Sequence, residues 1–207
     1  MPLTRAERAA ATRAALLRSA SSSICELGMQ GASIDLVAER AGYTKGAFYA
    51  HFASKEELFL AMLDERFAQE LQRLDATMAG SGEPTDEARE AAGEFLRYVD
   101  RDPEWPRLYQ EFAAHAARNE DFRARFAARQ RELRAGIADV FARWAFSFGI
   151  EPPVDPGDVA AMTFFMADGF LIGRIIDPEI DDGLYATMIE AFLRGLLAMA
   201  HAPPRSD

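Results

Sequence analysis

The stretch IDLVAERAGYTKGAFYAHF, residues Ile34–Phe52, decides the fold of the amino-terminal part of the chain. Its spacing predicts two short helices joined by a tight turn, in which Gly42 supplies a positive φ and Ala38 is small where the helices cross. The apolar residues recur on one side and predict the core of a three-helix module. They are Ile34, Val37, Ala41 and Phe48. The outer face of the second helix is therefore left for a partner.

That outer face carries the chemical groups that reach DNA. A hydroxyl, a cation, a bare backbone, a phenol and an imidazole are types that contact phosphates or base edges. They belong to Thr44, Lys45, Gly46, Tyr49 and His51. Gly46 also lets the helix backbone approach a duplex with no side chain in between. The pattern predicts a helix-turn-helix that binds double-stranded DNA.

The distribution of charge supports this interpretation although the chain as a whole is acidic. The formal net charge is -10, but residues 1–55 contain seven basic and four acidic residues and include both lysines, Lys45 and Lys55. A local excess of positive charge is the electrostatic footprint of a nucleic-acid partner. The sequence thus predicts a small basic module followed by an acidic body.

Helical periodicity continues through the rest of the chain, and no run of alternating β-branched residues predicts a strand. We expect an all-α fold with a helix-turn-helix DNA-binding domain at 1–53 and a larger ligand-binding and dimerisation domain at 54–207. The first helix should run from about Arg5 to Leu27 and end at Gly28, and Ser54 with Glu57 forms a capping box for the helix that joins the domains. Further helices are expected at about 34–41, 44–51, 54–79, 85–101, 104–118, 120–148, 157–175 and 182–200.

About 60 residues of this region resemble the TetR family of repressors. The resemblance rests on GMQGAS (Gly28–Ser33), AGYTKGAFYAHF (Ala41–Phe52) and SKEEL (Ser54–Leu58), in the family's order and spacing. It implies that Ser33 and Lys55 contact backbone phosphates, in addition to the recognition-helix residues above. The sequence departs from the family at Tyr43 and Ala50, which leaves open which bases are contacted.

The helix at 157–175 is apolar on nearly its whole circumference, so it must be buried on two sides. Gly169, Gly173 and Gly195 could admit a close neighbouring helix, either in the same subunit or across a two-fold axis. The resemblance implies a homodimer built by the last two helices. Large flexible and aromatic side chains further suggest an adaptable pocket for a small apolar or aromatic effector. The candidates are Phe112, His115, Phe126, Trp144, Met162, Phe165, Met166 and Phe170.

Two other classes of function fit the sequence less well than a repressor that its effector releases from the operator. An enzyme is disfavoured because the chain has no pair of histidines at metal-binding spacing, no histidine close to Cys25 and no glycine-rich phosphate loop, so we expect neither catalysis nor a cofactor or metal. A helical small-molecule-binding module without DNA function would not explain the charge distribution.

The expected compartment is the cytoplasm. Cys25 cannot pair within the chain, and no leader precedes the first helix. Asp168 and Arg174 interrupt the longest apolar run, Val159–Ile176, so no membrane partner is expected.

Overall fold

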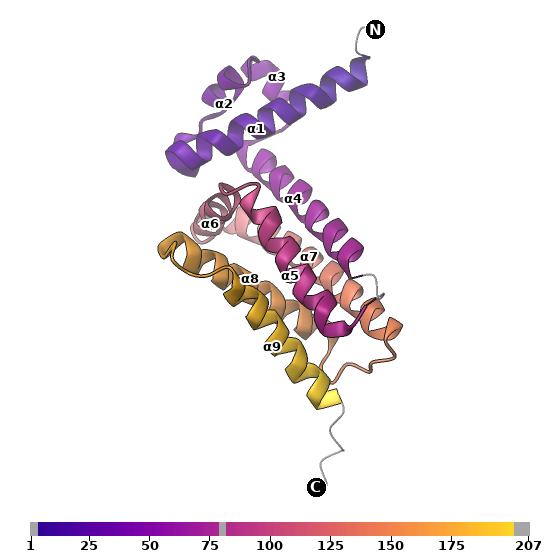
Figure 1. The fold of residues 1–207 in the computed structure, drawn as a ribbon. Coiled ribbons are helices and arrows are strands. Elements are labelled where there is room, and N and C mark those ends of the chain that lie inside the picture. Colours follow the sequence, from indigo (N-terminus) through magenta and orange to yellow (C-terminus); the bar gives the residue numbers. More distant parts are fainter. Residues whose placement is uncertain (1–3, 79–81, 201–207) are drawn as a thin grey trace. The chain divides into compact units, whose positions relative to one another are not determined.

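The computed structural model describes residues 4–78 and 82–200 (Figure 1). Within these ranges the chain is α-helical without any strand, which confirms the all-α prediction. The helices are α1 (Arg5–Gly31), α2 (Ile34–Arg40), α3 (Lys45–Tyr49), α4 (Lys55–Thr77), α5 (Pro84–Asp100), α6 (Trp105–Ala116), α7 (Glu120–Ser147), α8 (Pro156–Ile176) and α9 (Gly183–Ala200).

The chain divides into two compact units. The first contains the described residues up to Arg66 together with Glu104–Arg129, and the second contains Phe67–Pro103 and the described residues from Gln130 onwards. The first unit therefore holds α6 together with α1, α2 and α3. We call the three helices α1, α2 and α3 the head. The domain boundary at residue 53 stays a prediction.

Within the first unit, α2 and α3 pack beside α1 (Figure 1). The buried side chains of the head include Ile24, Val37 and Phe48, and the Ser19 hydroxyl donates to the Val37 carbonyl at 2.8 Å. Gly42 has a φ of 78° in the turn between α2 and α3, as expected. The turn is present, and Val37 and Phe48 are buried as predicted, whereas Ile34 and Ala41 are only half-buried.

The ends of the head helices are fixed by short side chains. Ser33 accepts a hydrogen bond from Leu36 N and Thr44 accepts one from Ala47 N, each at 3.2 Å, so both are N-caps. Ser54 likewise accepts from Glu57 N at 3.1 Å. This is one half of the predicted capping box. In the other half the Glu57 carboxylate accepts from the backbone N–H of Ala53, at 2.6 Å, and not from that of Ser54.

Gly28 interrupts α1 rather than ending it. Its backbone is non-helical, with a φ of 70° and a ψ of 169°, and helical structure resumes from Met29 to Gly31. The predicted end at Gly28 thus marks a kink, and the last turn of α1 leads directly into the N-cap of α2.

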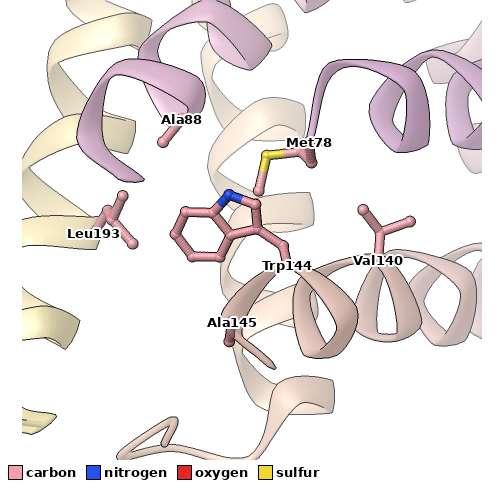
Figure 2. Packing of buried hydrophobic residues seen from close by; sticks show 6 residues of the cluster. All are labelled: Met78, Ala88, Val140, Trp144, Ala145 and Leu193. Atoms are coloured by element: carbon pink, nitrogen blue, oxygen red, sulfur yellow. The ribbon is translucent and has the colours of Figure 1, made fainter. Parts of the chain in front are cut away.

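In the second unit α9 packs against both α5 and α8. Figure 2 shows the indole ring of Trp144 among the side chains of Met78, Ala88 and Leu193, which belong to one buried cluster. The indole N–H donates to the buried Glu87 carboxylate at 2.9 Å, and the other Glu87 oxygen accepts from Gly82 N at 2.6 Å. A polar interaction therefore anchors the aromatic core of this unit.

Much of α8 and α9 is apolar but open on the surface of the single chain. Phe165 is 61% exposed, and Met162, Ile176, Leu184 and Met199 are also exposed. Both helices are long and apolar enough to cross a membrane by length and composition alone, so the interruptions at Asp168 and Arg174 do not by themselves exclude a membrane span. The three charged residues of α8, Asp158, Asp168 and Arg174, are too few to lower its mean hydropathy sufficiently. Two such helices are nevertheless weak evidence for a membrane.

The three glycines of these helices differ in their surroundings. A Cβ at Gly173 would lie 3.2 Å from Ile180 Cδ1 of the same chain, whereas Cβ atoms at Gly169 and Gly195 would meet nothing within 4 Å. Gly173 therefore accommodates the connection between α8 and α9, and only the other two leave room for another helix.

Candidate nucleic-acid interface and ligand cavity

The short helix α3 presents most of the predicted DNA-binding residues to solvent. Phe48 is its buried residue, while Thr44, Lys45, Gly46 and Tyr49 are exposed at its start and along its outer side. The Tyr49 ring, 50% exposed, meets the Phe48 ring edge-on with centroids 5.6 Å apart. The core thus fixes the base of Tyr49 and leaves its outer part available to a ligand.

Lys45 forms an ion pair with a carboxylate of the neighbouring helix α2. Its Nζ lies 3.0 Å from Asp35 in the first turn of α2. The hydrogen bond that Lys45 donates to the Asp35 carboxylate raises the pKa of Lys45, and the charge of Asp35 acts in the same direction. Both side chains are more than half exposed, so the pair is weak and a phosphate can compete for the ammonium group.

The other predicted phosphate contacts have more restricted settings. Ser33 is exposed, but its hydroxyl already caps α2, and His51 is half-buried with its ring centroid 6.4 Å from that of Phe52. Lys55 is half-buried, and its Nζ donates to the Met29 carbonyl at 2.7 Å. An ammonium group has three donors, so this bond leaves Lys55 others for a phosphate. The contacts of all three residues with DNA stay predictions.

The eight predicted ligand-binding residues are divided between the two units. Phe112, His115 and Phe126 lie in the first unit, where His115 Nε2 is 3.8 Å from Glu56 and its ring packs edge-on against Phe122. Phe112 and Phe126 are buried in aromatic contacts with Phe59 and Tyr109, respectively. These contacts are those of a packed core.

The remaining five candidates lie in the second unit, on α7 and α8. Met162 and Phe165 are exposed, Met166 is half-buried, and Phe170 packs in a cluster with Tyr185. Only Trp144 among the eight borders the cavity described next. Ligand contacts by the other seven stay predictions.

The second unit contains an apolar cavity of about 60 Å³ beside Trp144. Side chains of α5, α7, α8 and α9 line it, together with Met78 and prolines of the segment that joins α7 to α8. Thr163 is the polar side chain in the lining, and its hydroxyl is hydrogen-bonded to the carbonyls of Val159 and Ala160. The cavity therefore suits an apolar group that needs no hydrogen bond.

Sequence reasoning missed most of this lining. Phe141, Ile189 and Leu193 occur at ordinary core spacing, so nothing in the sequence distinguished them from other apolar residues. Pro152, Pro153 and Pro156, which lie in the sequence where α7 gives way to α8, also line the cavity. In the described residues no group of three or more His, Cys, Asp and Glu side chains is placed to hold a metal ion.

Comparisons with known proteins agree with this arrangement. Residues 16–62 match the family described as "Bacterial regulatory proteins, tetR family", and residues 84–198 match "BetI-type transcriptional repressor, C-terminal". The second match alone covers more than half of the chain. The chain belongs to the TetR family. Both matched families are families of transcriptional regulators, and a ligand-binding module without DNA function is not favoured.

Two curated TetR-type relatives match parts of the chain. The transcriptional activator FasR of Mycolicibacterium smegmatis is 31% identical over 99 residues, which are 48% of this chain and 45% of FasR. The transcriptional repressor AcnR of Corynebacterium efficiens is 28% identical over 135 residues, 64% of this chain and 65% of AcnR. The chain thus spans about half to two thirds of the length of these relatives.

Solved TetR-type structures share the fold over nearly the whole chain. A TetR-family regulator from Mesorhizobium loti has a TM-score of 0.75 at 19% identity, covering 95% of this chain and 98% of its own. FadR from Bacillus subtilis, solved with stearoyl-CoA, has a TM-score of 0.72 at 16% identity, with coverages of 91% and 99%. At these identities the similarity establishes the fold alone.

Proposed function

We propose that this TetR-family regulator is a repressor that binds its operator as a homodimer and is released by a small apolar effector. The observation that carries the DNA-binding part is α3, which buries Phe48 and exposes Thr44, Lys45, Gly46 and Tyr49. The match of residues 84–198 to a repressor domain and the relative AcnR support repression. The relative FasR is named an activator. Whether this chain lowers or raises transcription is therefore the first point to test.

The proposed DNA contacts divide by role. Lys45, Tyr49 and His51 reach the duplex from α3 and its carboxyl end, and Gly46 allows close approach. Ser33, Thr44 and Lys55 lie at the starts of α2, α3 and α4, where hydroxyl, ammonium and backbone N–H groups favour phosphates. Contacts from α3 confer sequence preference, and contacts from the helix starts fix the position of the head.

The cavity beside Trp144 is the proposed binding site for part of the effector. Its volume of about 60 Å³ is well below the roughly 150 Å³ of an apolar protein cavity that holds benzene, so only a narrow apolar group enters without displacing side chains. FadR binds the acyl thioester stearoyl-CoA. The end of an alkyl chain suits both the small volume and the apolar lining of the cavity.

The dimer is proposed from the exposed apolar surface of α8 and α9. Only 17% of the most apolar window of α8 and 11% of that of α9 is buried within the single chain. A surface of this kind favours a partner, and a second copy can cover it with the same surface. Two heads joined in this way could enter major grooves roughly 34 Å apart on one face of DNA.

We place this non-enzymatic regulator in the cytoplasm.

The test begins with a duplex that the wild-type chain enriches from a random library. In transcription from a promoter that contains this duplex, the chain should lower transcript yield, and stearoyl-CoA should restore it. A rise in transcript on adding the chain would show an activator. Failure to enrich any duplex would refute operator binding.

A fluorescence titration tests the cavity independently of DNA. Trp105 and Trp144 are the two tryptophans, so Trp105→Phe leaves the indole beside the cavity as the reporter. Stearoyl-CoA should change its emission, and Ala145→Leu, which fills the cavity, should weaken the response. An unaltered response in the filled variant would place the ligand elsewhere.

A further inference from the structure

The backbone N–H and carbonyl of Met29, which we call the Met29 peptide, are each bound by a charged residue of another helix. Met29 is 2% exposed and follows the kink of α1 at Gly28. Its N–H donates to Glu111 Oε2 of α6 at 3.2 Å, and its carbonyl accepts from Lys55 Nζ of α4 at 2.7 Å. Residues far apart in sequence thus converge on the backbone of one residue, within the first unit.

The surrounding packing supports this arrangement. A Cβ at Gly28 would lie 3.4 Å from Glu111 Oε2, so the carboxylate lies directly against the glycine. The next residue of α6, Phe112, packs on Phe59 with ring centroids 5.6 Å apart, and Lys55 Nζ is 5.9 Å from the Phe59 centroid. Glu111 itself is exposed, but it projects from a buried contact between α4 and α6.

We infer that Glu111 is a positioning residue for DNA binding, which acts through the Met29 peptide. The last turn of α1 leads from Met29 to Ser33, the N-cap of α2, while the other partner of the peptide is Lys55. Both Ser33 and Lys55 are phosphate contacts in the proposed function, on which this inference rests. Glu111 holds the two groups in place before DNA arrives, which lowers the entropy lost on binding.

Charge and positioning predict opposite effects for removing Glu111. A carboxylate on a DNA-binding unit repels phosphates, so its removal should strengthen binding to every duplex if charge alone matters. Loss of the hydrogen bond to Met29 should instead weaken binding. Glu111→Gln and Glu111→Ala remove the same charge, but only Gln keeps an acceptor for Met29 N–H.

The test compares these two variants with wild type and with Gln110→Ala, a polar deletion at the neighbouring position of α6. Binding is measured by fluorescence anisotropy with the duplex that wild type enriches from a random library, at several salt concentrations. Glu111→Ala should bind about two- to tenfold more weakly than Glu111→Gln, as expected for one hydrogen bond. The salt slope should not change, because Glu111 contacts no phosphate. Gln110→Ala should bind like wild type.

Amide hydrogen exchange supplies a readout that does not need DNA. The Met29 amide should exchange faster in Glu111→Ala than in wild type and remain protected in Glu111→Gln. Equal exchange in all three proteins, or equal DNA affinity of the Ala and Gln variants, would overturn the inference. If wild type enriches no duplex, the proposed function fails, while the exchange measurement still decides whether Glu111 holds the Met29 peptide.

Discussion

Replacing Gly46 by alanine should separate DNA binding from folding. Gly46 is the second residue of α3, and a Cβ there would meet only Thr44 Oγ1, at 3.7 Å, which is ordinary van der Waals contact. Its φ is not among the positive values found at glycines of the described residues. The isolated head therefore has room for a methyl group at this position.

The expected effects on stability and affinity have opposite signs. Alanine is favoured over glycine in a helix by up to about 1 kcal/mol, with less at a helix end, so the free energy of unfolding should rise slightly or stay constant. If the backbone of α3 lies against the duplex, the methyl group displaces the helix and disturbs neighbouring base contacts. A loss comparable to one good base contact, about 1–3 kcal/mol or roughly ten- to a hundredfold in affinity, is expected.

Gly42→Ala is the matched control. A Cβ at Gly42 also meets nothing within 4 Å, but its φ of 78° is left-handed, which costs a residue with a Cβ about 1–2 kcal/mol. Thermal unfolding and anisotropy should therefore show a destabilised Gly42→Ala and a stable Gly46→Ala that binds poorly. An unchanged DNA affinity of Gly46→Ala would show that the backbone of α3 does not lie close to DNA. A lowered melting temperature would show that the fold itself requires this glycine.

Four further substitutions test other parts of the proposal. Lys55→Ala should flatten the dependence of log affinity on log salt by about one unit per subunit, and an unchanged slope would exclude a phosphate contact. Tyr49→Ala should lose about 1–3 kcal/mol more on the enriched duplex than on random DNA, whereas equal losses would restrict Tyr49 to the backbone. Phe165→Glu should convert the dimer to a monomer in sedimentation, and a wild type that is already monomeric at micromolar concentration would refute the dimer. Burial raises the pKa of Asp168 in the folded chain. The ionised carboxylate therefore destabilises the folded chain above this pKa, and the penalty disappears as the pH falls to the pKa of the unfolded chain. Asp168→Asn should raise the melting temperature at pH 7 but not in strong acid.

The head was predictable because its determinants are local. The positive φ of Gly42, the caps Ser33 and Thr44 and the buried Phe48 each follow from residue type and short spacing. The kink at Gly28 was predicted as a helix end for the same reason, since glycine favours left-handed backbone in either case. Local rules did not reveal that one more turn follows.

The cavity and the polar anchors were not predictable because they depend on long-range packing. Glu87 and Trp144 are 57 residues apart, and Met29 and Glu111 are 82 apart, so no periodic pattern links them. A surplus of aromatic side chains also cannot distinguish a cavity from a filled core, as Phe112 shows by its contact with Phe59. Lys55 was expected to face DNA from its position in the motif, but its half-buried setting depends on the shape of α1 at Gly28.

The DNA-reading surface depends on contacts outside α3. A helix of five residues is not stable alone, so α3 holds its shape through the Thr44 cap, the burial of Phe48 and the packing of Phe48 against Phe52 at a centroid distance of 5.7 Å. These residues pack with α1 and α2, whose junction includes the Met29 peptide. Since α6 belongs to the same compact unit and contacts that peptide through Glu111, a change in α6 alters the support of the recognition helix within this unit.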